Sequence, residues 1–159
     1  MALPDDVLAD FEQQAMYDRS AWFVDEVLEI VPETHTVRAL MHTTHLPFVD
    51  AQRDLPGHPR HVPAAIAIQA TGTLGLLYAT YVLGLRATDG WSGFGTKIEG
   101  ARWGSLARIG PPVEMRCTCV KTRELRGTRF CWFGFEFVQE DAWVYRSRQS
   151  AAWRRVAPA

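Results

Sequence analysis

Asp54, His61 and Gln69 are the side chains of this sequence whose types and positions could do chemistry together. Asp54 and His61 lie in a proline-bearing segment, and both can transfer a proton. Gln69 follows in a long uncharged segment, and its amide can donate a hydrogen bond or position a water molecule but cannot transfer a proton at neutral pH. Either His61 is a base that Asp54 orients or protonates, or one of the two activates a water molecule.

Each of these three residues also has a structural interpretation. Asp54 precedes Leu-Pro-Gly and is a common turn residue. His61 is either a neighbour of a helix cap or a solvated loop histidine. Gln69 needs a hydrogen-bond partner if its helix is buried, and a second copy of the chain could supply one.

Two histidine pairs have a spacing that suggests metal ligands, namely His42 with His45 and His58 with His61. Both pairs fall in a predicted loop or strand end, where this spacing does not place two rings on one face. No cysteine pair completes a zinc set. We therefore expect no metal site and no cofactor.

The element that must position these residues is the segment 62–85, which holds no charge over 24 positions. Its length would allow a membrane span. However, Pro63, Gln69 and three glycines dilute its hydropathy, and the strand-patterned remainder of the chain needs something apolar to cover. The composition favours a helix that is buried on all sides, starting at Pro63 and ending near Gly84. We expect no association with a membrane.

Alternation of apolar and polar residues with a period of two predicts strands on both sides of this helix. The expected strands cover residues 21–31, 36–42, 91–103, 113–121, 128–139 and 143–153. Residues 4–17 predict a short amphipathic helix, and residues 43–62 predict a loop because of their prolines. Strands around one long helix indicate an α+β protein with an antiparallel sheet that covers the helix.

The length of 159 residues fits one domain, which we expect to span residues 1–159. The chain has 17 Lys and Arg against 18 Asp and Glu, and this balance argues against a protein that binds nucleic acid. Three cysteines without framework spacing, and no secretory signal, predict a reduced, cytoplasmic protein. The segment 128–137 is apolar on both sides, which requires another layer and predicts a homodimer or a higher oligomer.

Three segments resemble the β-hydroxyacyl-acyl carrier protein dehydratase branch of the hotdog-fold superfamily. Residues 22–31 resemble its opening strand, although Asp18-Arg19 stands where the family has His-Arg. Residues 47–57 resemble its loop with Pro-Phe-Phe and Gly-His-Phe-Pro-Gly, and residues 63–72 resemble the start of its central helix. The resemblance implies the hotdog fold, an antiparallel sheet wrapped around one long central helix.

The same comparison shows which family residues are replaced. Asp54 stands at the position of the family's catalytic histidine, and Gln69 stands at that of its catalytic carboxylate. The intervening segment is slightly longer than in the family, so His61 falls near the helix entrance. We predict Asp54, His61 and Gln69 as catalytic residues and Gly57, Ala64 and His58 as substrate-binding residues. The N–H group of Gly57 or Ala64 would bind a thioester oxygen, because the first N–H groups of a helix lack partners.

The ligand that the resemblance implies is an acyl chain on the phosphopantetheine arm of acyl carrier protein or coenzyme A. Our first hypothesis is a divergent 3-hydroxyacyl-thioester dehydratase of fatty-acid or polyketide-type metabolism. The alternatives are an acyl thioesterase of the same fold and a non-catalytic protein that binds an acyl carrier or an assembly partner. Arginines near the end of the sequence form either a docking face for an acidic carrier or a solvated sheet edge. They are Arg146, Arg148, Arg154 and Arg155.

Overall fold

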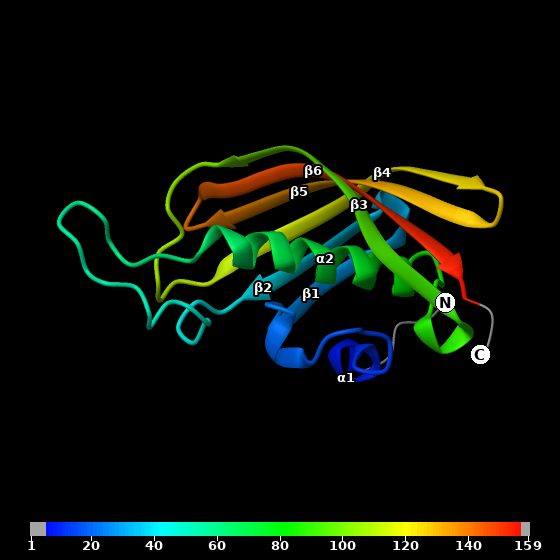
Figure 1. Cartoon of the computed structure of the whole chain (residues 1–159), viewed down its shortest axis with the longest axis horizontal. Coiled ribbons are helices and arrows are strands. Elements are labelled where there is room, and N and C mark those ends of the chain that lie inside the picture. The colour runs from blue at the N-terminus through cyan, green and yellow to red at the C-terminus, as the bar shows by residue number, and fades with distance from the viewer. Residues whose placement is uncertain (1–5, 157–159) are drawn as a thin grey trace.

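One long helix, α2, packs on a six-stranded sheet in the computed structural model, which describes residues 6–156 (Figure 1). The helices are α1 (Val7–Phe11) and α2 (Ala64–Tyr81), with short 3₁₀ turns at Arg19–Ala21, Pro32–Thr34 and Ala87–Asp89. The strands are β1 (Glu26–Val31), β2 (Thr36–Met41), β3 (Trp91–Trp103), β4 (Val113–Leu125), β5 (Thr128–Gln139) and β6 (Ala142–Arg155).

The strands lie in the order β1-β2-β4-β5-β6-β3, and every neighbouring pair is antiparallel. Two strands, β1 and β3, form the edges of the sheet. The chain enters α2 after β2 and returns at the far edge as β3, so the helix crosses the face of the sheet between these two strands. This arrangement confirms the expected α+β class and the hotdog architecture.

The helix α2 begins directly after Pro63 and ends at Tyr81, shortly before Gly84, which has a left-handed φ of 68°. Most of its side chains are buried because it lies on the sheet. The expected boundaries of this helix are therefore confirmed to within a few residues. In the part of the chain that the structure describes, no helix has the combination of length and apolarity that a membrane crossing requires.

The expected alternation is confirmed in β4 up to Cys119 and in β5 from Cys131 onward, where every second side chain is buried. Phe133, Phe135 and Phe137 of β5 are in the core, together with Met115 and Cys117 of β4. Burial of such side chains is the main favourable contribution to folding. The opposite face of β5 is half-buried, and no second layer covers it among the residues that the structure describes.

The N-terminal part of the described chain differs from the expectation of a helix over residues 4–17 and a strand from residue 21. The helix α1 ends at Phe11, and β1 begins only at Glu26; residues 4 and 5 lie outside the described residues. The reason is Trp22, which packs against Phe11 with ring centroids 4.9 Å apart and donates a hydrogen bond to the carbonyl of Tyr17. Phe23 has a left-handed φ of 54°, which breaks the strand at this point.

Asp10 joins this N-terminal segment to the end of α2. Its carboxylate accepts a hydrogen bond of 2.7 Å from the hydroxyl of Tyr81 and two from Arg86. The hydrogen bond from Tyr81, followed by that from Arg86, holds the pKa of Asp10 below its ordinary value of 3.8. A carboxyl group with a lowered pKa stabilises the folded state above its unfolded pKa and loses this contribution as the pH falls through its folded pKa.

We expect Asp10→Asn to lower the free energy of unfolding at neutral pH, because the charged partner of Arg86 is lost. The difference from the wild type should begin to shrink as the pH falls below 3.8, where the unfolded carboxyl becomes protonated, and should vanish once the pH is below the lowered pKa of the folded carboxyl. Urea unfolding at a series of pH values measures this difference. The exposed Asp89 provides the control, since Asp89→Asn should change little. A difference that does not depend on pH would contradict the assignment.

Candidate functional site

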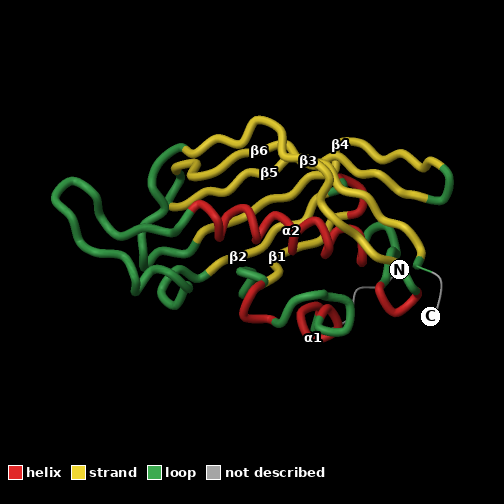
Figure 2. The backbone as a smooth tube through the Cα atoms, in the orientation of Figure 1, coloured by secondary structure: helices red, strands yellow, loops and turns green. Residues whose placement is uncertain are grey.

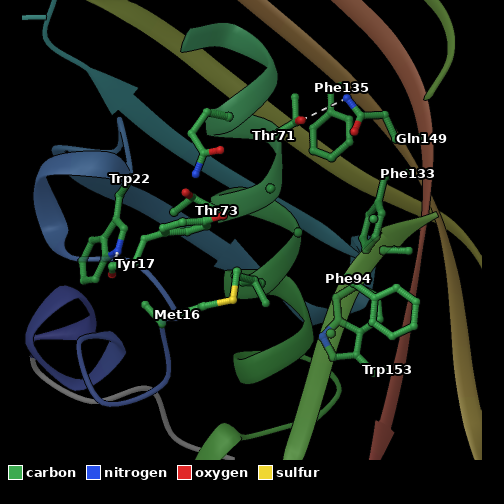
Figure 3. A pocket seen from close by; sticks show the side chains of 18 of the residues that line it. Met16, Tyr17, Trp22, Thr71, Thr73, Phe94, Phe133, Phe135, Gln149 and Trp153 are labelled. Carbon is green, nitrogen blue, oxygen red and sulfur yellow. Dashed lines mark hydrogen bonds between the residues drawn. The ribbon is translucent and has the colours of Figure 1, made fainter. Parts of the chain in front are cut away.

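A cavity of about 250 Å³ lies beside the middle of α2 and is called cavity 1 here. Figure 3 shows its walls: Phe94, Phe133 and Trp153 come from the sheet, while Met16, Tyr17 and Trp22 come from the N-terminal segment. Most of this lining is aromatic or apolar. Pockets of this kind, with a few polar groups among apolar walls, are typical binding sites for small molecules.

Two glycines bring cavity 1 close to the backbone of α2. Gly72 lies in the interior of the helix, and a methyl group placed there would meet nothing within 4 Å. Gly75, one turn later, faces the ring of Phe133, whose Cε2 atom would be 3.8 Å from such a methyl group. Glycine in a helix interior costs about 1 kcal/mol relative to alanine. Here it leaves open space against the helix.

The sheet wall of cavity 1 depends on a third glycine. Gly93 in β3 pairs with Trp153 in β6, and the indole ring lies directly over the glycine. A Cβ atom at position 93 would overlap this ring, at 2.6 Å from Cε2. Trp153 also contacts Phe133 edge to face, with ring centroids 6.1 Å apart. The absence of a side chain at Gly93 therefore sets the position of the indole.

Gln69 lies on the helix wall of cavity 1. Its Nε2 group donates a hydrogen bond of 3.3 Å to the carbonyl oxygen of Ala21, which also identifies this end of the amide as the nitrogen. Its Oε1 atom has no hydrogen-bond partner among the described residues. Gln69 therefore presents an acceptor to the cavity.

A second amide, that of Gln149, lines the same cavity from β6. Its Nε2 group lies 2.9 Å from Oγ1 of Thr71, 3.0 Å from Oγ of Ser147 and 3.3 Å from Oη of Tyr145. These three hydroxyl-bearing residues are almost fully buried. One end of the Gln149 amide is thus held by the core, and the other end has no hydrogen-bond partner among the described residues (Figure 3).

A separate cavity of about 220 Å³, cavity 2, lies at the start of α2. His61 and Ala64 line it, together with Trp103 and Tyr145. The backbone of His61 is fixed by Gln52, whose side-chain amide bonds both its carbonyl, at 2.7 Å, and its N–H group, at 3.0 Å. Nδ1 of His61 is 3.0 Å from the carbonyl oxygen of Pro59.

The loop between β2 and α2 carries the remaining predicted residues and extends beyond the sheet (Figure 2). Asp54, Gly57 and His58 are exposed on it and line none of the three cavities described here. Gly57 has a left-handed φ of 74° in a tight turn, and the His58 ring stands edge to face with that of His61. Within one chain, the six predicted residues therefore lie in three places: this loop, cavity 2 and, for Gln69, cavity 1.

The other histidine pair lies near a third, more polar cavity of about 290 Å³. His42 and His45 line it together with Asp25 and Arg19. The His42 ring is 3.2 Å from the Glu26 carboxylate, and its backbone N–H donates to Asp25. Among residues 6–156, no group of three or more His, Cys, Asp or Glu side chains is arranged to hold a metal ion.

Gln149 and the glycines of cavity 1 are not among the site residues predicted from the sequence. The alternation of β6 contains a signal for Gln149, because Tyr145, Ser147 and Ala151 on either side of it share its inward face. A glutamine on the core face of a strand needs buried partners. The alternation of β6 does not show which helix residue is the hydrogen-bond partner of Gln149, since Thr71 is far away in the sequence.

Comparisons by sequence find no match, either with protein-family models or with curated proteins. Comparisons by structure do find similar folds. One is a thioesterase from Haemophilus influenzae, with a TM-score of 0.59 and 17% identity, covering 87% of this chain and 83% of that chain. Another is a hypothetical thioesterase with coenzyme A from Streptococcus pneumoniae, with a TM-score of 0.62 and 11% identity over 93% and 97% of the two chains.

A third similar structure is the dehydratase heterocomplex ApeI:P from Xenorhabdus doucetiae. It has a TM-score of 0.62 and 12% identity, and the match covers 88% of each chain. At such low identity, a structural match informs on the fold, whereas function depends on the site. From the strand order, the helix that crosses the sheet and these matches, we conclude that the chain has the hotdog fold.

Proposed function

We propose that the protein binds an acyl thioester in cavity 1 and hydrolyses it. The observation that carries this proposal is the Gln69 amide, which lines the cavity with its nitrogen bonded to Ala21 and its oxygen without a partner among residues 6–156. An amide oxygen in this state can accept a hydrogen bond from a water molecule and hold it beside a thioester carbonyl.

Hydrolysis also needs a group that removes a proton from this water. In the described part of the chain, no Asp, Glu or His side chain lines cavity 1, so the proton acceptor has to come from elsewhere. Asp54 is our candidate, because it is exposed on a loop that reaches beyond the sheet. A second copy of the chain would bring this loop to the cavity.

The exposed edge of β3 supports such a homodimer. This strand pairs only with β6 among the described residues, and three of its large apolar side chains are about half exposed: Phe94 by 50%, Ile98 by 47% and Trp103 by 51%. An unpaired strand edge and clustered apolar surface both favour contact with another chain. Since Phe94 also lines cavity 1, a partner on this edge would lie beside the site.

In the proposed reaction, Asp54 takes a proton from the water molecule that Gln69 holds, and the water oxygen forms a bond with the carbonyl carbon. The tetrahedral intermediate then breaks its carbon–sulfur bond, and the sulfur receives the proton from Asp54. The products are a carboxylic acid and a free thiol. The similar structure that contains coenzyme A supports a phosphopantetheine thioester as the substrate class.

Dehydration of a 3-hydroxyacyl thioester is the second candidate, supported by the similarity to a dehydratase complex. It needs a base for the α-proton and an acid for the departing hydroxyl. Gln69 cannot supply a proton, so Asp54 would have to serve in both steps. Hydrolysis needs only one proton acceptor and one positioned water molecule, which Asp54 and Gln69 would supply. We therefore prefer hydrolysis.

The test is to incubate the protein with acyl and 3-hydroxyacyl pantetheine thioesters and to analyse the products by mass spectrometry. Release of free thiol supports hydrolysis, whereas loss of one water molecule from the hydroxylated substrate supports dehydration. Binding without any conversion would contradict both reactions and indicate a binding protein. In a dehydratase with weakened chemistry, Gln69→Glu should increase the loss of water.

We expect Gln69→Leu to lower the turnover of the thioester by roughly 100-fold, because the attacking water loses its fixed position. The matched control is Gln13→Leu, which makes the same change at an exposed glutamine on the N-terminal segment. Steady-state rates of thiol release measure both variants. Unchanged turnover in Gln69→Leu would place the reaction outside cavity 1.

A further inference from the structure

Two of the three buried, free cysteines of this chain face each other across neighbouring strands. Cys119 lies in β4 and Cys131 in β5, and both side chains are on the inward face of the sheet. In the register of the two strands, Cys119 pairs with Phe133, whereas Thr122 pairs with Cys131. Cys119 and Cys131 are therefore diagonal neighbours on one face, and the proposed reaction in cavity 1 uses neither thiol.

A β-bulge in β4 lies directly beside this pair. The register shifts between Cys119 and Lys121, so that the exposed Val120 is an extra residue in the strand. A bulge disrupts the regular ladder and bends the strand that carries it. The Sγ atom of Cys119 is 3.5 Å from the carbonyl oxygen of Lys121, which places the sulfur against the irregular backbone of the bulge.

The hydroxyl group of Tyr78 reaches the same place from α2. Tyr78 is fully buried, and its hydroxyl oxygen is 3.1 Å from Nδ1 of His35, an exposed residue in the turn between β1 and β2. The N–H group of Cys119 donates a hydrogen bond of 2.9 Å to the carbonyl oxygen of His35. Cys119 therefore lies next to an exposed turn, and 5% of its surface is accessible.

The contacts of Cys119 favour its ionised form. A hydrogen bond donated by the Cys131 thiol lowers the pKa of Cys119 to about 7, and one from the Tyr78 hydroxyl acts in the same direction, against the effect of burial. The same hydrogen bond to Cys119, together with burial, raises the pKa of Cys131. Since the thiolate is the reactive form of cysteine, Cys119 is the nucleophile of the pair and Cys131 is a protonated thiol beside it.

We propose that Cys119 and Cys131 form a thiol pair that hydrogen peroxide oxidises to a reversible disulfide. The Cys119 thiolate attacks one peroxide oxygen, the O–O bond breaks, and the released hydroxide takes up a proton and leaves as water, so that Cys119 becomes a sulfenic acid. The Cys131 sulfur then attacks the Cys119 sulfur; the S–S bond forms, the S–O bond breaks, and the hydroxyl group leaves as water with the proton of Cys131. Two thiols and one peroxide thus give one disulfide and two water molecules.

The surroundings of the pair favour a small oxidant. Neither Cys119 nor Cys131 lines any of the three cavities described here, and only a small part of Cys119 is exposed. Hydrogen peroxide is hardly larger than water and can approach the sulfur beside the turn, whereas a bulky disulfide reagent cannot. The inference does not depend on the proposed hydrolysis of thioesters, because the thiol pair lies outside cavity 1.

The test treats reduced wild-type protein with hydrogen peroxide at neutral pH, alkylates the remaining thiols after unfolding and maps the tryptic peptides by mass spectrometry. Trypsin cleaves after Lys121 and Arg129, so Cys119 and Cys131 fall on different peptides, and fragmentation distinguishes Cys119 from Cys117. We expect a disulfide between Cys119 and Cys131, an alkylated Cys117, and three free thiols again after treatment with dithiothreitol. Three free thiols under peroxide, or a disulfide that involves Cys117 or joins two chains, would overturn the proposal.

Serine variants assign the two roles. Cys119→Ser should slow the oxidation of Cys131 at least ~10-fold, because the remaining thiol keeps its proton. Cys131→Ser should stop at the sulfenic acid of Cys119, which dimedone traps. The control is Cys117→Ser, which should form the disulfide like the wild type, since burial raises the pKa of Cys117 and keeps it unreactive. A Cys131→Ser variant that folds and yields no trapped Cys119 would contradict the order of the two steps.

The pH dependence of the wild-type rate tests the proposal without any substitution and decides if a variant does not fold. The fraction of thiolate rises with pH until the pH exceeds the pKa of the attacking thiol. We expect the rate of disulfide formation to level off above about pH 7, the lowered pKa of Cys119. A rate that keeps rising through pH 9.0, the ordinary pKa of a cysteine, would show that the contacts of Cys119 do not activate it.

Discussion

Asp54→Asn is expected to lower thioester hydrolysis at least ~100-fold while leaving the affinity for substrate nearly unchanged. Asparagine has the shape of aspartate but cannot take a proton from water, and loss of a general base costs about this factor or more. Steady-state kinetics of thiol release would show the effect in kcat rather than in KM. The matched control on the same loop is Asp50→Asn, which removes an exposed ion pair with Arg60 and should have little effect.

Asp54→Asn also tests whether the loop that carries Asp54 contributes to cavity 1 of the partner copy. Two differently tagged chains, one with Asp54→Asn and the other with Gln69→Leu, are expressed together, and the mixed dimers are isolated through both tags. If the loop of one copy serves cavity 1 of the other, one of the two sites keeps both native side chains, and about half of the wild-type activity should return. Mixed dimers without activity would show that the loop serves its own chain. A monomer in sedimentation experiments at micromolar concentration would contradict the dimer itself.

Gly93→Ala is expected to destabilise the protein by about 1–3 kcal/mol, since overpacking of a core forces side chains and backbone to move. The added methyl group overlaps the indole ring of Trp153, which is buried between β3 and the core and cannot move without displacing Phe133. Urea unfolding measures the loss. Gly95→Ala, two residues along the same strand, meets nothing within 4 Å and provides the control.

The double variant with Trp153→Ala checks the cause of this loss. Once the indole is removed, the methyl group at position 93 has room, so Gly93→Ala should cost much less in this background. The single variant should also weaken ligand binding, because the displaced indole is a wall of cavity 1. An equal cost in both backgrounds would mean that the strain arises in the backbone of β3 rather than at Trp153.

The elements with a clear period could be predicted from the sequence. The strands β4, β5 and β6 contain alternating segments that face the core, and the helix α2 stands out as a long uncharged segment because it is buried on most sides. The region before β1 has no such regularity. There Trp22 and Phe11 pack on each other instead of continuing a helix and a strand, and short-range patterns do not reveal a tertiary contact of this kind.

The candidate site could be predicted in part. The position of Gln69 on a buried helix was predicted, and the structure adds that it lines a cavity, while His61 and Ala64 lie at the start of that helix beside another cavity. Asp54 is separated from Gln69 within the chain, and sequence spacing could not show this because the loop follows its own hydrogen bonds, such as those of Gln52. The Gln149 amide is held by a hydrogen bond to Thr71, which lies 78 positions away in the sequence, so a local pattern could not predict its place in the site.

The position of β3 in the sheet has a consequence for synthesis on the ribosome. This strand is made before β4 and β5, yet within residues 6–156 it pairs only with β6, the last of the six strands to be completed. While β4 and β5 are translated, Phe94, Ile98 and the glycines of β3 have no neighbour that could hold them in place. Pairings between distant parts of a chain form late and leave apolar segments open to wrong contacts. We therefore expect a nascent chain that stalls before β6 to depend on chaperones until translation resumes.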